Sequence, residues 1–242
     1  MAGNIVRQVD NWIQIRRVLI SVSDKSGLAR LVPAMIDVNP AIHFYSTGGT
    51  YRHLAQILGP RAADHLTPVA HYTGQPETQG GLVKTLDFKI YLGLLTERYN
   101  QAHQADLART GAWPLDMVIC NLYPFQATVA RPGVTLEEAR ANIDIGGPCM
   151  IRAAAKNFLR VAAVVDPADY AGLVDQLQDN GGKLDLTARF ALARKALAHT
   201  ARYDAAISQF LARQDPASLR TLYDLSDPGD TNAREGTTEE TT

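Results

Sequence analysis

The sequence has few of the residues on which several common classes of protein depend. It contains only two cysteines, Cys120 and Cys149, each inside an apolar stretch and neither in a C-x-x-C pair. This excludes a disulfide scaffold and argues against a zinc site. Its six histidines form no H-x-x-x-H or H-E-x-x-H pair, so no metal site is predicted. The low cysteine content fits a reducing, cytoplasmic setting best.

The chain also lacks an excess of charge and a long apolar run. Lys and Arg number 24 against 25 Asp and Glu, a net charge of -1. There is no broad positive field of the kind that binds nucleic acids or membrane surfaces, so we expect neither as a partner. No run of about 18 apolar residues occurs, and we expect no signal peptide and no membrane span. The Walker, G-x-G-x-x-G and nucleophile-elbow patterns are missing as well.

What is present predicts a globular α/β protein. The 242 residues are 46% hydrophobic and 20% charged, enough for one large domain with extensions. Compact β-branched runs alternate with helical patterns, which predicts a three-layer α/β/α fold with a mainly parallel central sheet. We expect strands at 18–22, 43–46, 117–121 and 161–165. We expect helices at 26–38, 54–58, 136–142, 150–156, 170–177 and 187–212.

Three features set the predicted boundaries. Pro33 lies inside the first helix, which must therefore be kinked or begin late. The apolar residues of the helix at 187–212 exceed what a short surface helix needs, so it either wraps the sheet or packs on a second subunit. Beyond Leu225 no large apolar side chain occurs, and nothing there offsets the entropy of ordering. We predict an N-terminal extension at 1–15, a domain at 16–213 and a C-terminal extension at 214–242, disordered from about 226.

Ligands of open parallel sheets bind beyond the carboxyl ends of the strands, so the residues that follow each predicted strand are the candidates for a ligand site. Ser21 to Lys25 supplies two hydroxyls and an ammonium group. Ser46 to Thr50 supplies hydroxyls and two glycines ahead of a helix, which together resemble a phosphate cradle. The alternative for the second cluster is a tight turn with a threonine N-cap.

Two further clusters carry ionisable groups. Gly80 to Asp87 contains Lys84, which is either a solvated surface lysine or a partly buried one whose lowered pKa would suit it to proton transfer. Asn121 to Phe125 is followed, some twenty residues on, by Asn142 to Pro148. Within the latter, Asp144 either caps the helix that begins near Pro148 or is buried with a partner or presented to a ligand.

As a set, these segments resemble a known family. SVSDKSGL, STGGT, VKTL, NLYPF, ATVARPGVTLEEARANIDIGGP and RAAAKN occur in the order and spacing of the IMP cyclohydrolase domain of the bifunctional enzyme AICAR transformylase/IMP cyclohydrolase. The resemblance covers roughly residues 16–210. It implies a methylglyoxal-synthase-like fold, usually dimeric. It also implies closure of the ring of 5-formamidoimidazole-4-carboxamide ribotide (FAICAR) to IMP and water, without metal or cofactor.

The resemblance also implies roles for individual residues. Lys84 would donate toward the formyl oxygen, Tyr123 would be an oxyanion donor, and Asp144 would form a coupled pair with Lys156 that helps to deprotonate the carboxamide. The other positions carried over would bind the substrate and its phosphate. These substrate-binding positions are Ser21, Ser23, Lys25, Ser46, Thr47, Gly48, Gly49, Thr50, Thr85, Asn121 and Gly146.

The sequence departs from the family pattern in two ways. Where the family reads Asp-Gly-Arg-Val-Lys-Thr-Leu-His-Pro-Lys-Ile-His-Gly-Gly, residues 80–93 lack the arginine, which is replaced by Leu82, as well as both histidines and the proline. The transformylase half is not found in the chain, so a separate protein would have to supply FAICAR. Two alternatives stay open: a non-catalytic module that binds phosphorylated nucleotides, and a phosphate lyase of the methylglyoxal-synthase type.

Overall fold

A parallel sheet forms the centre of the molecule. The computed structural model describes residues 5–75 and 83–225. Its five strands lie in the order β4 (Leu66–Pro68), β3 (His43–Ser46), β2 (Arg17–Val22), β5 (Met117–Asn121) and β6 (Ala162–Val164), all parallel. The predicted tail from about 226 and the start of the third cluster, Gly80 to Leu82, lie outside the described residues.

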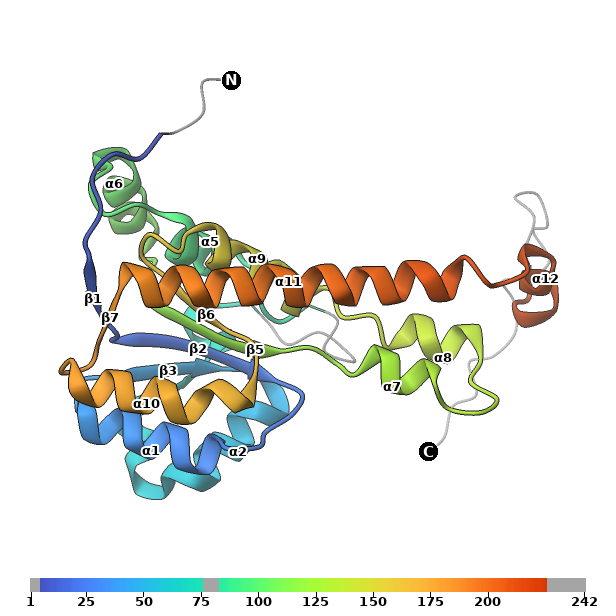
Figure 1. Ribbon diagram of the computed structural model, residues 1–242, viewed down its shortest axis with the longest axis horizontal. Coiled ribbons are helices and arrows are strands. Elements are labelled where there is room, and N and C mark those ends of the chain that lie inside the picture. Colours follow the sequence, from blue (N-terminus) through green and yellow to red (C-terminus); the bar gives the residue numbers. More distant parts are fainter. Residues whose placement is uncertain (1–4, 76–82, 226–242) are drawn as a thin grey trace, which may run out of the picture.

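Helices cover both faces of this sheet (Figure 1). One core joins the sheet to α1 (Leu28–Val38), α2 (Gly48–Leu58) and α10 (Tyr170–Asp179). The other joins it to α5 (Phe88–Leu95), α9 (Gly146–Lys156) and α11 (Leu186–Leu211). Neighbouring strand residues alternate between the two cores, as Ile20 and Leu19 do. The three-layer α/β/α fold predicted from the sequence is confirmed.

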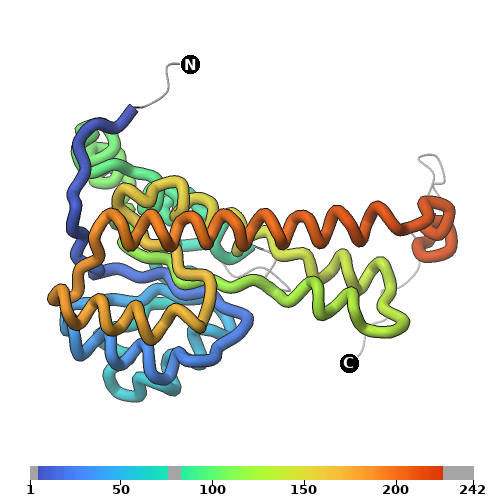
Figure 2. Tube along the Cα trace, viewed as in Figure 1, coloured from blue at the N-terminus to red at the C-terminus, as the bar shows by residue number. Residues whose placement is uncertain are grey.

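Shorter elements complete the chain. They include α3 (Ala62–His65), α4 (Val69–Thr73), α6 (Gln101–Thr110), α7 (Phe125–Val129), α8 (Leu136–Ala141) and α12 (Leu219–Leu222). Single 3-10 turns lie at Gly59–Arg61, Pro167–Asp169 and Pro216–Ser218. Figure 2 shows α11 running past the sheet, with α7 and α8 below its far half. None of the helices within residues 5–75 and 83–225 combines the length and hydropathy needed to cross a bilayer.

Three predicted helices begin where the sequence did not place them, and one of them, α9, begins at Gly146 rather than at 150. α1 starts at Leu28, two residues after the predicted start, and continues through Pro33 to Val38. α2 starts at Gly48, six residues before the predicted Leu54, so the two glycines form its first turn rather than a separate turn. A small antiparallel sheet pairs β1 (Trp12–Gln14) with β7 (Lys183–Asp185), and no periodicity predicted it because each strand has three residues.

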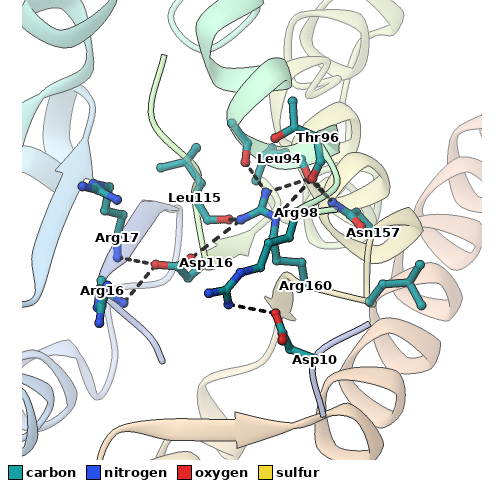
Figure 3. A network of polar contacts seen from close by, with 12 residues as sticks. Asp10, Arg16, Arg17, Leu94, Thr96, Arg98, Leu115, Asp116, Asn157 and Arg160 are labelled. Atoms are coloured by element: carbon teal, nitrogen blue, oxygen red, sulfur yellow. Dashed lines mark hydrogen bonds and ion pairs between the residues drawn. The ribbon is translucent and has the colours of Figure 1, made fainter. Parts of the chain in front are cut away.

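At the amino edge of the sheet a buried polar network joins several elements (Figure 3). Asp116 accepts hydrogen bonds from the N–H groups of Arg16 and Arg17 at 3.0 and 2.9 Å, and its Oδ1 lies 3.7 Å from Arg160 Nη1. The Arg160 guanidinium also donates to backbone carbonyl groups. These belong to Gly93, Leu94, Thr96 and Leu115. Burial raises the pKa of Asp116, and the neighbouring N–H groups and Arg160 oppose that rise.

A second buried arginine attaches the N-terminal segment to the same edge. Arg189 on α11 is fully buried and bonds only to carbonyl oxygens. Those oxygens belong to Asp10, Asn11, Phe158, Leu159 and Leu184. The guanidinium therefore joins the segment before β1 to β7 and to the loop before β6.

Candidate functional site

The carboxyl ends of β2, β3 and β5 meet at one edge of the sheet, and the predicted clusters lie beyond it. Asn121, the last residue of β5, shapes the loop after β2. Its Oδ1 accepts the N–H groups of Ser23 at 2.7 Å and Asp24 at 2.8 Å, and its Nδ2 donates to the Asp24 carbonyl at 2.8 Å. The amide of Asn121 is thus engaged by the chain and positions this loop.

The side chains of that loop are left partly open. Ser21 and Ser23 are half-buried, and the Lys25 ammonium lies 3.3 Å from the Ser23 carbonyl. Asp24 is exposed and accepts the N–H of Ser26 at 2.8 Å. The first cluster therefore presents a hydroxyl and a lysine near the start of α1, as the sequence suggested.

Two hydroxyls of the second cluster fasten α2 to the central strand. Ser46 is fully buried and donates to the Ile20 carbonyl at 2.7 Å. Thr50 donates to the Val22 carbonyl at 3.0 Å and accepts the Val22 N–H at 3.2 Å. Both hydroxyl protons are used inside the protein, so these side chains hold the first turn of α2 in place.

The rest of the second cluster is open. Thr47 occupies the N-cap position of α2 with extended backbone, but its side chain makes no capping hydrogen bond. Gly48 has a φ of +49°, a region that favours glycine. The threonine N-cap alternative is therefore correct in position, while the first N–H groups of α2 have no side-chain acceptor from Thr47.

A pocket, here called the α2 pocket, opens beside this first turn. Two cations line it: Lys84 Nζ lies 3.3 Å from where a Cβ on Gly48 would stand, and Arg52 Nη2 lies 3.9 Å from the corresponding position on Gly49. Lys84 is exposed, so the partial burial suggested from its apolar neighbours is not found. The pocket is lined by Ser46, Thr47, Gly48, Tyr51, Arg52, Pro68, Val69, Ala70, Gln75, Val83 and Lys84.

The residue after Lys84 joins the α2 pocket to the start of α9. Thr85 is buried, and its Oγ1 lies 3.0 Å from the position of a Cβ on Gly146. At Gly147 a Cβ would stand 2.5 Å from Leu122 Cδ2 and 2.6 Å from Asp144 Oδ2. A side chain at Gly147 would displace the side chains of Leu122 and Asp144, so glycine lets α9 begin close beside both.

Asp144 lies at the centre of this approach. Its Oδ1 accepts the Gly147 N–H at 2.9 Å, as a helix cap would, and it also accepts the backbone N–H of Tyr123. The Asp144 N–H donates to the hydroxyl of Tyr203 on α11 at 2.7 Å. Burial raises the pKa of Asp144 even though the two N–H groups act to lower it. The carboxyl is thus both a cap and a partly buried ionisable group at the edge of the site.

The coupled pair of Asp144 and Lys156 is not formed within one chain. Asp144 precedes α9, and Lys156 is its exposed last residue. Ten residue steps of α-helix separate Gly146 from Lys156, about 15 Å at the usual rise. No ion pair between Asp144 and Lys156 occurs within residues 5–75 and 83–225, and their coupling therefore stays a prediction. The side chain of Tyr123 is exposed at 54%, and the backbone N–H of the same residue contacts Asp144.

Two polar residues of the α2 pocket had no place in the sequence prediction. Arg52 follows Gly48 by one helical turn. This spacing is visible in the sequence only when the helix is taken to begin at Gly48. Gln75, whose Oε1 is buried without a hydrogen-bond partner, follows α4 and reaches the pocket through the fold alone.

In the segment 82–91, which departs from the family pattern, the residues from Asp87 onward have structural roles. Asp87 caps α5 by accepting the N–H of Lys89 at 2.8 Å. The hydroxyl of Tyr91 is buried beside Cys149, and burial raises the pKa of Tyr91. No group of three or more His, Cys, Asp or Glu within the described parts of the chain is placed to hold a metal.

Comparisons with known proteins show which families and proteins this chain is similar to. The model of the MGS-like domain matches residues 27–149, and that of the AICARFT/IMPCHase bienzyme matches residues 154–236. The bifunctional purine biosynthesis protein PurH of Magnetococcus marinus is 48% identical over 202 residues, which are 84% of this chain and 37% of that protein. PurH of Chloroflexus aurantiacus is 47% identical over 203 residues, again 84% of this chain and 38% of that protein.

A solved structure extends the likeness to three dimensions. The crystal structure of ForH is similar with a TM-score of 0.70 and 31% identity, covering 81% of this chain and 97% of that one. The chain spans less than two fifths of the length of the two PurH relatives. The fold and the sequence motifs of this chain therefore both resemble those of the same group of proteins.

Proposed function

The chain belongs to the MGS-like domain family and to that of the AICARFT/IMPCHase bienzyme, and from this membership we propose that it acts in purine biosynthesis as an IMP cyclohydrolase. The observation that carries the proposal is the meeting of three predicted clusters at one edge of the sheet. Lys84 lies against the first turn of α2, and Thr85 lies against the first turn of α9 beside Asp144. A cation, a helix N-terminus and a partly buried carboxyl thus surround one site.

The reaction requires few groups. The carboxamide nitrogen of FAICAR attacks the formyl carbon and gives up one proton, and the formyl oxygen gains negative charge. That oxygen takes up this proton and the N–H proton of the former formamido group and leaves as water, as the C–O bond breaks and the C=N bond of the ring forms. Positioning, a donor at the developing oxyanion and an acid/base group are sufficient. Lys84 is the proposed donor to the formyl oxygen, and Tyr123 is the second proposed oxyanion donor.

Asp144 is the proposed base. Its raised pKa makes it a better proton acceptor than an ordinary carboxylate, and its fixed Oδ1 leaves Oδ2 as the reactive oxygen. Lys156 has no part in this step within one chain, because α9 holds it at the far end. The 5'-phosphate is assigned to the α2 pocket and the Ser23 to Lys25 loop, and no metal or cofactor enters the scheme.

The test uses purified protein and FAICAR. IMP formation followed by absorbance or chromatography is expected to exceed the uncatalysed rate, and supplying FAICAR directly makes the result independent of which enzyme produces it. Binding of IMP without turnover would overturn the proposal and favour the module that binds phosphorylated nucleotides. Release of inorganic phosphate from a triose phosphate would instead favour the lyase.

We further propose a homodimer in the cytoplasm. α11 exposes Phe190, Leu197 and Leu211 at 46%, 44% and 45%, more apolar surface than a helix packed on one core needs. Sedimentation equilibrium is expected to give twice the monomer mass. A Leu197→Glu variant is expected to shift the protein toward monomer, with exposed Arg194→Glu on the same helix as the control for added charge.

A further inference from the structure

We propose that Arg52 is a phosphate-binding residue that gives this site its selectivity for a phosphate monoester over the free nucleoside. The inference rests on the proposed function, because it names a ligand for the same site. Arg52 lies on α2 one turn after Gly48, lines the α2 pocket and places Nη2 near Gly49. Nothing in the motifs that carry the family resemblance assigns it a role.

The first argument is the charge of the α2 pocket. Among the described residues, neither Asp nor Glu lines it, whereas Lys84 and Arg52 both do. Arg52 forms no ion pair with a carboxylate in the part of the chain that the structure describes. Two cations beside the positive end of a helix repel one another unless an anion lies between them. A dianionic phosphate ester supplies that charge.

The second argument is the open N-terminus of α2. α5, α6, α8 and α11 each have a side-chain acceptor at the N-cap, namely Asp87, Asn100, Thr135 and Asp185. α2, which has eleven residues, has none from Thr47, and the N-cap residues of α1, α9 and α10 likewise provide none. An anion at this end accepts from its first N–H groups, and a guanidinium one turn along presents a planar fork to the same oxygens.

The third argument separates Arg52 from Lys84. The Lys84 ammonium lies on the Gly48 side, and the next residue, Thr85, continues to Gly146 and Asp144, where the proposed chemistry takes place. Arg52 lies on the Gly49 side, where its Nη2 is 3.9 Å from the position of a Cβ on that glycine. Arg52 is therefore placed to act on the substrate's phosphate, whereas Lys84 lies between that phosphate and the reacting end.

The experiment compares Arg52→Met and Arg52→Lys with the wild type. The control is Arg109→Met, which removes an exposed arginine from α6 on the other side of the molecule (Figure 1). Calorimetric titration with IMP and with inosine measures the two affinities, the rise in Tm with inorganic phosphate measures anion binding, and FAICAR turnover gives kcat and KM. All variants change exposed side chains, and Tm without ligand checks that they fold.

Arg52→Met is expected to weaken IMP binding by about 10- to 100-fold, the usual effect of losing charge-assisted hydrogen bonds. Inosine binding should stay as in the wild type, the Tm response to phosphate should shrink, and the loss of kcat/KM should appear in KM. The IMP affinity of Arg52→Lys should lie between those of the wild type and Arg52→Met. An ammonium group keeps the positive charge but lacks the planar set of N–H donors of a guanidinium group. IMP affinity equal to that of Arg109→Met would overturn the proposal.

The readouts separate this proposal from the proposed function. A wild type that binds phosphate through Arg52 but never converts FAICAR would retain the anion site and refute the cyclohydrolase. A wild type that converts FAICAR with the same KM in Arg52→Met would refute the role of Arg52 and leave the cyclohydrolase intact.

Discussion

Charged side chains at the two edges of the central sheet have opposite surroundings. At the amino edge, Asp116, Arg160 and Arg189 are buried, and each is surrounded by protein partners. At the carboxyl edge, Arg52 and Lys84 are exposed, and the described part of the chain provides neither with a carboxylate.

This difference shows how structural and functional charges can be told apart. A buried charge whose hydrogen bonds are complete already has its partners and stabilises one arrangement of the chain. Charges gathered beside an uncapped helix without a counterion have their partner outside the protein. Substitutions at the amino edge should therefore change the free energy of unfolding, and those at the carboxyl edge should change binding or turnover.

The largest effect is expected from Arg160→Met at the amino edge. The variant leaves the Asp116 carboxyl buried without its ion pair and deprives several carbonyls of a donor, which should lower the free energy of unfolding by about 3–5 kcal/mol. Urea denaturation measures it, with the exposed Arg109→Met expected to stay within about 0.5 kcal/mol. A loss no larger than that of the control would show that the network contributes little to stability.

Lys84→Ala at the carboxyl edge should show the reverse pattern. If the ammonium stabilises the developing oxyanion, kcat should fall by about 10²- to 10³-fold, while Tm stays near the wild-type value because the side chain is exposed. Lys183→Ala, an exposed lysine on β7, is the matched control. Unchanged kcat would remove Lys84 from the mechanism, and a large drop in Tm would place it with the structural charges.

Asp144→Asn tests a residue that is both a structural helix cap and the proposed catalytic base. As the proposed base, it should contribute about 10²-fold to kcat, and its acid-limb titration should vanish from the pH profile of the variant. Its folded pKa is raised, so the folded protein binds more protons than the unfolded chain between the unfolded and the folded pKa.

Stability contributed by this group is therefore lost as pH rises through that window. Above the window, Asp144→Asn should be as stable as the wild type or more so, since Asn Oδ1 can still accept the Gly147 N–H. A variant with normal activity and pH dependence would show that Asp144 is only a helix cap, and one that unfolds at neutral pH would show that its charge stabilises the fold.

The sequence predicted best the elements that carry their own pattern. β5 has the predicted bounds, 117–121, because five consecutive residues are buried between two layers of helices. α11 matches within one residue at each end, since its N-terminus is capped by Asp185. β4 was missed because three residues carry no readable period, and their strand conformation comes from pairing with β3.

The residues of the candidate site also divide into those that the sequence predicted and those that it did not. The residues that follow the strands were found from the sequence because the carboxyl edge of a parallel sheet brings them together. Arg52 was missed because α2 was started too late, and tertiary bonds such as Thr50 to Val22 fix its true start. The coupling of Lys156 with Asp144 stays a prediction, because the helix expected at 150–156 begins already at Gly146 and separates the two residues along its axis.

The smallest effects are expected within the carboxyl edge itself, where Ser46 and Thr47 are neighbours with opposite surroundings. Ser46→Ala removes a buried hydrogen bond to the Ile20 carbonyl and should cost about 1 kcal/mol of unfolding free energy while leaving IMP affinity within about twofold. Thr47 is half-buried beside the uncapped end of α2, so Thr47→Ala should leave Tm unchanged and weaken IMP binding several-fold. An equal loss of IMP affinity in the Ser46→Ala and Thr47→Ala variants would contradict this expectation. It would mean that the Ser46 hydroxyl gives up its hydrogen bond to Ile20 and binds the ligand instead.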